Sequence, residues 1–157
     1  MLALNTIRIY TDGSCHTQLK YGAWAAIIQI SNNEHIINGT AKNTTHNRME
    51  LQAIINAVEY LGLNKISFDK IEVFTDSQYA VNLTTRKHRI LENNYLTKKG
   101  SPLQNNDLLK GLFNLFETMP LKLIKVAAHQ PVNSNNNQNR KVDLIVRALM
   151  RETIPHA

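Results

Sequence analysis

The sequence predicts an α/β fold in which a five-stranded mixed sheet carries helices on both faces. Alternating apolar and β-branched residues mark five short strands, whereas apolar residues three to four positions apart mark the helices. The order is three strands, a helix, a strand, helices, a strand and a helix, which favours a sheet with parallel and antiparallel pairs. A chain of 157 residues fits one domain, so we expect a single domain over residues 1–157.

The first half of the chain contains three predicted strands and one helix. We expect strands over Ile7–Thr11, Ala23–Ile30 and His35–Gly39, with a polar turn between the last two. From Asn47 the apolar period becomes helical, and the single apolar stripe continues until Gly62. This stripe must face the sheet, because it is the only apolar face of the helix.

The second half begins with a buried strand over Ile71–Thr75, directly followed by Ser77, a good N-cap for a short helix through Leu83. Polar, turn-rich segments are expected over 84–104 and 130–139. The remaining predicted elements are an amphipathic helix over 108–119 that Pro120 closes, a strand over Leu121–Ala127 and a helix from about Lys141 to Arg151.

Cysteine content and hydropathy exclude several classes of protein. The single cysteine, Cys15, excludes an internal disulfide and a cysteine-based zinc site, and a lone thiol fits a reducing compartment. The longest apolar run, Ala23–Ile28, has six residues, whereas about 20 are needed to span a bilayer. No secretory signal is recognisable at the N-terminus. We therefore expect a cytoplasmic protein without membrane segments, and nothing indicates more than a monomer.

The charge of the chain favours an anionic partner. Eighteen Lys and Arg residues against twelve Asp and Glu residues give a net charge of +6, and nucleic acid is the leading candidate. Between residues 86 and 99 there are five Lys or Arg residues, among them Lys98 and Lys99, against the single acid Glu92. A solvated basic face is the alternative explanation for this segment.

Two of only five aspartates follow predicted strands. Asp12 lies at the end of the first strand and Asp76 at the end of the fourth. Ligands of open α/β sheets bind beyond the carboxyl ends of the strands, so these two acids are expected to converge. Taken singly, each also fits the role of a turn or cap aspartate.

Two further acids belong to predicted helices. Glu50 lies on the apolar stripe with Ile54 and Leu61, and a buried acid is costly unless a cation lies opposite it. A favourable interaction with the helix dipole explains the position of Glu50 along the helix but not its face. Asp143 begins the last helix, where an ordinary first-turn acid is the alternative.

Several acids in one crevice repel one another and raise their own pKa values unless cations neutralise them. A cluster of oxygen ligands favours Mg²⁺ or Mn²⁺ over zinc. Two such ions ~3.5 to 4 Å apart activate a water and stabilise the leaving oxygen in phosphodiester cleavage. A basic protein with this cluster is therefore a candidate nuclease.

Four segments of the chain resemble the motifs of type 1 ribonuclease H, the bacterial-type enzyme that cuts the RNA strand of an RNA/DNA hybrid. They are Tyr10–Cys15, Asn47–Leu51, Thr75–Tyr79 and Asn139–Asp143. The order and type of the predicted elements agree with this family from residue 6 to about 151. The resemblance implies a ribonuclease-H-like fold and endonucleolytic hydrolysis of RNA in hybrids, with two Mg²⁺ ions, or Mn²⁺ in their place.

The resemblance also implies roles for individual residues. The metal-binding carboxylates would be Asp12, Glu50, Asp76 and Asp143. His129 would assist proton transfer or product release, although an exposed loop histidine is the commoner case. Thr45 and Asn47 would hold a phosphate of the DNA strand, and Lys98 and Lys99 fall in a stretch with the length of the family's basic protrusion. The RNA contacts would be Gln78 and the backbone of Gly13, Ser14 and Cys15.

The chain departs from the family pattern at several positions that bear on substrate binding. His46 stands where an asparagine is usual, and Ile90 and Tyr95 fall near the usual tryptophans of the protrusion. The loop after Asp12 lacks the family's Gly- and Asn-rich stretch.

Two other functions remain open from the sequence. The first is a nuclease of the same fold that acts on structured DNA, and the intact Asn47–Leu51 segment counts against it. The second is a non-catalytic nucleic-acid-binding module, and the four filled acidic positions count against it.

Overall fold

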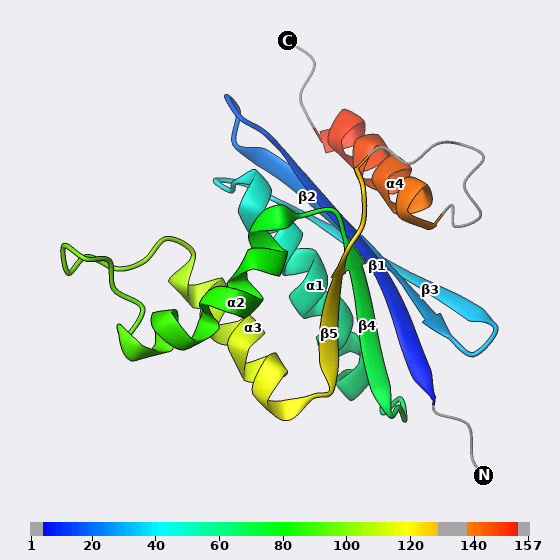
Figure 1. The fold of residues 1–157 in the computed structure, drawn as a ribbon. Helices are drawn as coiled ribbons and strands as arrows, with labels where there is room; N and C mark the ends of the chain where they lie inside the picture. The colour runs from blue at the N-terminus through cyan, green and yellow to red at the C-terminus, as the bar shows by residue number, and fades with distance from the viewer. Residues whose placement is uncertain (1–4, 129–137, 154–157) are drawn as a thin grey trace.

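A computed structural model describes residues 5–128 and 138–153, and Figure 1 shows the fold as a ribbon. Its five strands form one sheet in the order β3-β2-β1-β4-β5. The pairs β1–β2 and β2–β3 are antiparallel, whereas β1–β4 and β4–β5 are parallel. The strands are β1 (Thr6–His16), β2 (Tyr21–Ile30), β3 (Asn33–Ala41), β4 (Lys70–Thr75) and β5 (Leu121–Lys125). The predicted five-stranded mixed sheet is confirmed.

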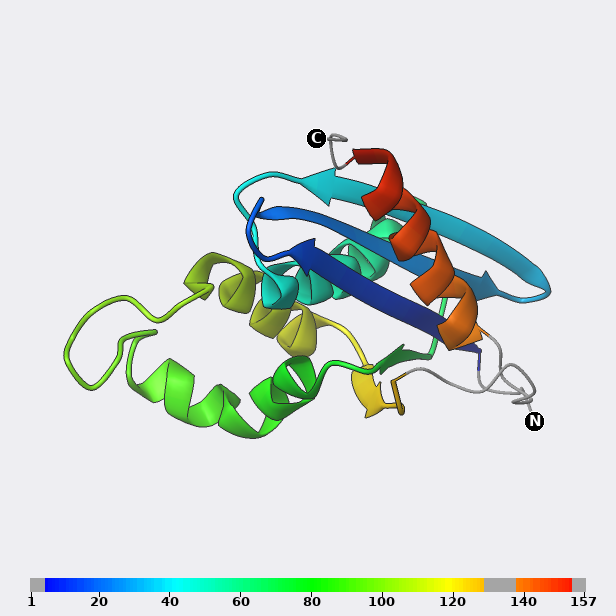
Figure 2. The same ribbon diagram turned by 90° about the horizontal axis from the view of Figure 1, so that it is seen from above.

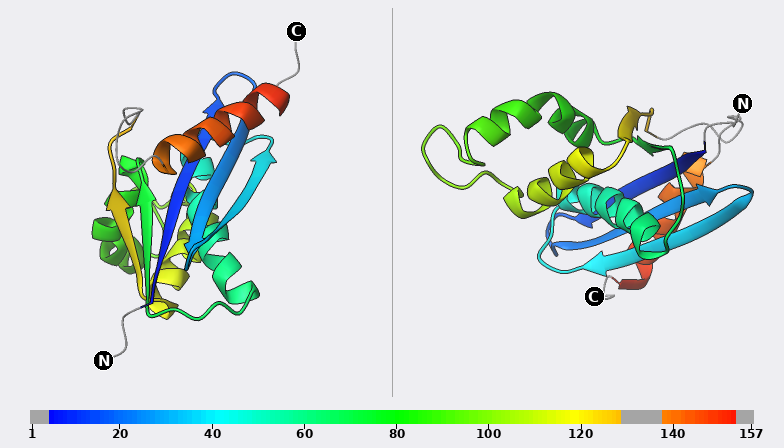
Figure 3. Two further views of the ribbon diagram at one scale, coloured as in Figure 1. Left: turned by 90° about the vertical axis from the view of Figure 1, so that its right-hand side faces the viewer. Right: turned by 90° about the horizontal axis from the view of Figure 1, so that it is seen from below.

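Helices lie on both sides of this sheet, as the sequence predicts. Three of them lie on one side and α4 lies on the other (Figures 2 and 3). The helices are α1 (His46–Leu63), α2 (Gln78–Glu92), α3 (Asn106–Thr118) and α4 (Gln138–Thr153). None of the helices in the described ranges is long and apolar enough to cross a membrane.

The central strands are buried on both faces, which explains why they contain nearly continuous apolar runs. On β1, Ile9 packs into the main core beneath α1 and α3, whereas Tyr10 packs into a smaller core beneath α4. The Tyr10 and Phe74 rings stack with their centroids 4.9 Å apart. From α4, Val142 and Val146 complete the smaller core and fix that helix on the sheet.

The first strand is longer than the sequence predicts, and Asp12 lies inside it rather than at its end. The parallel pairing of β1 with β4 stops at Tyr10 and Phe74, but the antiparallel pairing with β2 continues to His16 and Tyr21. Asp12 therefore lies two residues beyond the last parallel pair, where the sheet opens between β1 and β4. Alternation in the sequence could not reveal this extension, because Gly13 interrupts it.

The second helix is also longer than predicted. It ends at Glu92 rather than near Leu83. Ile90 is buried like Leu83 and holds this part of the helix on the core, but the residues between them are mostly exposed, so the sequence shows no broad apolar stripe there. The basic residues 86–89 thus belong to a helix and not to a turn-rich segment. Residues 93–105 form the segment that projects from the body of the molecule in Figure 1, and Lys98 and Lys99 lie on it.

Candidate active site

Three carboxylates from three different elements meet at one end of the sheet. They are Asp12 on β1, Glu50 on α1 and Asp76, which directly follows β4. Each offers an oxygen atom, and these atoms all lie within 4.8 Å of one another. Glu50 is fully buried and Asp12 is 9% exposed. The structure thus brings together three of the four acids that the sequence singles out.

Close contact between β1 and the start of α1 brings Asp12 and Glu50 together. A Cβ atom on Gly13 would lie 2.4 Å from the carbonyl carbon of Met49 and 2.5 Å from the amide nitrogen of Glu50. Such contacts are too short for any side chain, so only glycine allows the strand to approach the helix this closely. Gly13 therefore has a structural function here.

Hydrogen bonds at the start of α2 hold the backbone on both sides of Asp76. The Thr75 hydroxyl accepts from the Ser77 amide at 3.0 Å, and the Ser77 hydroxyl accepts from the Ala80 amide at 3.1 Å. Ser77 is the N-cap of α2, as its sequence position predicts. These two hydrogen bonds fix the backbone from which the Asp76 side chain extends.

Burial raises the pKa of Asp12 to about 9, and the negative charges of Glu50, Asp76 and Asp143 add to the rise, while the Gly13 amide opposes it. Burial also raises the pKa of Glu50, which His46 partly offsets. Within the described residues, neither carboxylate oxygen of Glu50 has a hydrogen bond of normal geometry. Burial and mutual repulsion therefore both disfavour the charged forms of these acids.

Asp143 borders this cluster without joining it. It lines the same cavity as Asp12 and Asp76, and the packing of Val142 on the sheet places it there. Its Oδ2 atom lies 3.1 Å from Nε of Arg147, one turn further along α4. Asp143 thus has an arginine as its ion-pair partner.

His46 is a site residue whose contact the sequence did not indicate. Its Nε2 atom lies 3.4 Å from Oε1 of Glu50. The contact with the Glu50 carboxylate raises the pKa of His46, whereas burial opposes the rise. The spacing of four residues would have suggested this contact, but only if the helix were known to include His46.

The donor set fits a hard divalent cation. It consists of carboxylate oxygens, which Mg²⁺ and Mn²⁺ prefer over the nitrogen and sulfur ligands typical of zinc. A cation among Asp12, Glu50 and Asp76 would remove the repulsion that raises the pKa of Asp12. It would also give a partner to the Glu50 oxygens.

A groove opens in front of the carboxylates, and several predicted nucleic-acid contacts line it. These are Gly13, Ser14, Asn47 and Gln78. The groove is also lined by the four acids and by His46.

A model of the family described as RNase H matches residues 5–151. The chain belongs to the RNase H family. Members of this family are metal-dependent endoribonucleases that hydrolyse the RNA strand of RNA/DNA hybrids, and this is the activity of the chain. The family expected from the four sequence motifs is confirmed.

Curated relatives agree with this family over nearly their whole length. Ribonuclease H of Ehrlichia canis is 34% identical over 148 residues, which cover 92% of this chain and 94% of the relative. Ribonuclease H of Caldicellulosiruptor saccharolyticus is 32% identical over 151 residues, which cover 95% of this chain and 99% of the relative. Both are similar along the RNase H domain that this chain forms.

Solved structures share the RNase H fold. LC9-RNase H1, described as a type 1 RNase H with the type 2 active-site motif, has a TM-score of 0.79 and 19% identity, covering 98% of this chain and 76% of its own. LC11-RNase H1, solved in complex with an RNA/DNA hybrid, has a TM-score of 0.68 and 19% identity. The match covers 95% of this chain and 99% of LC11-RNase H1. At this identity the likeness concerns the fold.

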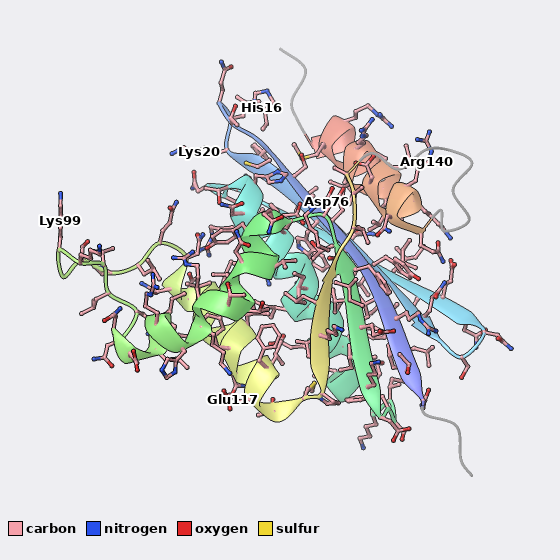
Figure 4. All side chains as sticks on the ribbon, in the orientation of Figure 1. His16, Lys20, Asp76, Lys99, Glu117 and Arg140 are labelled. Carbon is pink, nitrogen blue, oxygen red and sulfur yellow. The ribbon has the colours of Figure 1, made fainter. Side chains whose placement is uncertain are left out.

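Four other predicted site residues of this RNase H do not line the groove in front of the carboxylates: Thr45, Cys15, Lys98 and Lys99. Thr45 caps α1, where its hydroxyl accepts from the Arg48 amide at 3.2 Å. The Cys15 thiol donates to the Thr44 carbonyl at 3.4 Å. Lys99 projects far from Asp76 on the 93–105 segment (Figure 4). His129 lies outside the described residues.

Proposed function

We propose that Asp12, Glu50, Asp76 and Asp143 hold two Mg²⁺ ions, for which Mn²⁺ can substitute, and that this centre cuts the RNA strand of RNA/DNA hybrids. The observation that carries the proposal is the convergence of three carboxylates, two of them buried, one of which, Glu50, has no hydrogen bond of normal geometry among the described residues. When bound, the ions supply an activated water and stabilise the leaving oxygen. By family, the products carry 5′-phosphate and 3′-hydroxyl ends.

The carboxylates have different tasks in this proposal. Asp12 and Glu50 lie deepest, and burial keeps their oxygens away from competing water. Asp143 lies nearer to solvent, with 31% of its side chain exposed, and is paired with Arg147. It therefore completes the ligand set from the open side of the cavity.

Groove residues orient the hybrid. Gln78 lies at the start of α2 and lines the groove with the backbone of Gly13 and Ser14, so these groups are suited to contact the RNA strand. Contacts to the 2′-hydroxyl groups distinguish RNA from DNA at such positions. Asn47 lines the same groove, and together with Thr45 and Cys15 it belongs to the proposed contact set.

The projecting segment 93–105 is proposed to bind the nucleic acid through its positive charge and to take no part in catalysis. Lys98 and Lys99 lie on it, and Lys99 projects away from Asp76 (Figure 4). We propose that both lysines contact backbone phosphates of the hybrid. Such contacts raise affinity for any nucleic acid and weaken with salt.

His129 remains the proposed group for proton transfer or product release, on the basis of its place in the sequence just after the last strand. We also propose that the enzyme acts in the cytoplasm, because its one cysteine fits a reducing compartment, and that it acts as a monomer.

The proposal is tested by a metal titration on four substrates: an RNA/DNA hybrid, duplex DNA and duplex RNA of the same sequence, and a DNA junction. We expect internal cleavage of the RNA strand in the hybrid alone, and only with Mg²⁺ or Mn²⁺. Calorimetry should give a stoichiometry of two Mg²⁺ ions when a non-cleavable hybrid is bound. Cleavage of DNA junctions in preference to the hybrid, or binding without cleavage, would instead support one of the two functions left open by the sequence.

A further inference from the structure

His46 connects the buried Glu50 carboxylate to the open groove. The two residues are four positions apart on α1, and Nε2 of His46 lies 3.4 Å from Oε1 of Glu50. The histidine side chain is 60% exposed, whereas the side chain of Glu50 is 1% exposed. The His46 side chain therefore lies partly in solvent at the groove, while its Nε2 atom is close to a carboxylate that is almost fully buried.

Glu50 has few other groups that can fix its orientation. Neither of its oxygens has a hydrogen bond of normal geometry in the described part of the chain. The Gly13 amide lowers its pKa, but less than the contact with His46 does. A buried carboxylate that is free to turn would present its oxygens to a cation in several orientations.

We propose that His46 is a positioning residue for Glu50. Its Nε2 atom, 3.4 Å from Oε1, would hold the Glu50 carboxylate in the orientation in which it contributes an oxygen to the cluster with Asp12 and Asp76. This inference rests on the proposed function, in which Glu50 is a metal ligand. The Nε2 atom donates in one neutral tautomer of the ring as well as in the charged form, so the role requires no change in charge.

The expected size of the effect follows from the behaviour of other metal sites. Groups that hydrogen-bond to metal ligands orient them, and their loss typically costs 10–100-fold in metal affinity. His46 should therefore act on metal binding, and not on the affinity of the enzyme for the hybrid.

The test is a calorimetric titration of Mg²⁺ and Mn²⁺ into the metal-free protein and three His46 variants. His46→Leu keeps the bulk of the ring but removes the donor, so its metal Kd should rise about 10–100-fold. His46→Gln places an amide nitrogen at a similar reach and should restore most of the affinity. His46→Asn is too short to reach Glu50 and should behave like His46→Leu.

A matched control is present on α2. His88 and Glu92 form the same pair at the same spacing, with Nε2 and Oε1 2.8 Å apart, but both side chains are exposed. His88→Leu should leave the metal Kd unchanged. Thermal unfolding in a chelator verifies that each variant is folded before it is titrated.

Two outcomes overturn the inference: a metal Kd of His46→Leu within about twofold of the wild-type value, or a loss that His46→Gln does not restore. Tighter metal binding by His46→Leu would also overturn it, since His46 would then compete with the cation. Glu50→Gln separates this inference from the proposed function. If Glu50→Gln binds metal normally, the metal assignment fails; if it loses binding while His46→Leu does not, only the role of His46 fails.

Discussion

Arg48 in the first turn of α1 and Asp107 in the first turn of α3 are joined by two parallel hydrogen bonds of 2.9 and 2.8 Å. The same guanidinium donates to Oδ1 of Asn105 at 3.5 Å, and Nδ2 of Asn105 donates to the Tyr79 hydroxyl at 3.0 Å. The network ties α1, α2 and α3 together at the base of the 93–105 segment. It therefore fixes the projecting segment relative to the carboxylates.

Asp107→Asn should lower the free energy of unfolding near neutral pH by about 1 kcal/mol, since the pair is well aligned but partly exposed. Arg48 lowers the pKa of Asp107 from 3.8 to about 2. The Asp107 carboxylate therefore contributes its full stabilisation at pH values above the pKa in the unfolded chain. This stabilisation is lost as the pH falls through the lower pKa of the folded protein. Urea unfolding at a series of pH values checks this. A wild-type advantage that does not shrink in acid would contradict it.

Asp12→Asn should stabilise the metal-free protein. The pKa of Asp12 rises from 3.8 to about 9 in the fold, so the folded chain keeps a proton that the unfolded chain loses. Folding stability therefore falls as the pH rises between these two values, and asparagine removes the penalty. We expect a gain of at least about 1 kcal/mol near pH 8, because even a small part of such a shift exceeds this.

Thermal unfolding in a chelator measures the effect of Asp12→Asn, and the gain should be smaller near pH 5 than near pH 8. Saturating Mg²⁺ should reverse the order, because only the wild-type protein gains the full stabilisation by a bound ion. A lower Tm of the metal-free variant near pH 8 would show that the carboxylates do not repel one another as proposed.

Replacing Lys98 and Lys99 together by glutamine should weaken binding to every nucleic acid while the rate at saturation stays nearly constant. The slope of log affinity against log salt should fall by ~1 for each lost phosphate contact. Filter binding over a range of salt concentrations checks this, with Lys65 and Lys122 replaced in the same way as the control. An unchanged slope would mean that the segment is only a solvated face.

His129→Ala should lower turnover by ~10² or somewhat less and leave the KM for the hybrid and the metal dependence nearly unchanged. A group that moves a proton or releases a product phosphate acts after the substrate has bound. Steady-state kinetics from about pH 6 to 9 check this. Wild-type turnover across that range would exclude His129 from the reaction.

Much of the fold could be predicted because strands and helices of this chain have clear periods. The burial of Glu50 followed from its place on the stripe with Ile54 and Leu61, and all three are fully buried. Helix ends were less accurate. The first helix continues past Gly62 to Leu63, since a glycine costs a helix only about 1 kcal/mol and packing compensates for it.

The site was predicted less completely than the fold. The meeting of Asp12, Glu50 and Asp76 depends on the end of the parallel β1–β4 pairing and on one helix face. The sequence pattern predicts that helix face and the end of β4, but not the extension of β1 past Asp12. The contact of His46 with Glu50 depends on where α1 begins, and the predicted start at Asn47 excluded His46 from the helix. The ion pair of Asp143 with Arg147 was not predicted either, although both lie on the last helix.

The cleavage rate of Asp76→Asn at saturating hybrid and Mg²⁺ tests the central claim most directly. Asparagine keeps the shape of the side chain but removes the charge next to Asp12 and Glu50. The rate should fall by several orders of magnitude, while the Kd for the hybrid remains close to the wild-type value. A rate within about tenfold of wild type would contradict the assignment of this cluster as the catalytic metal centre.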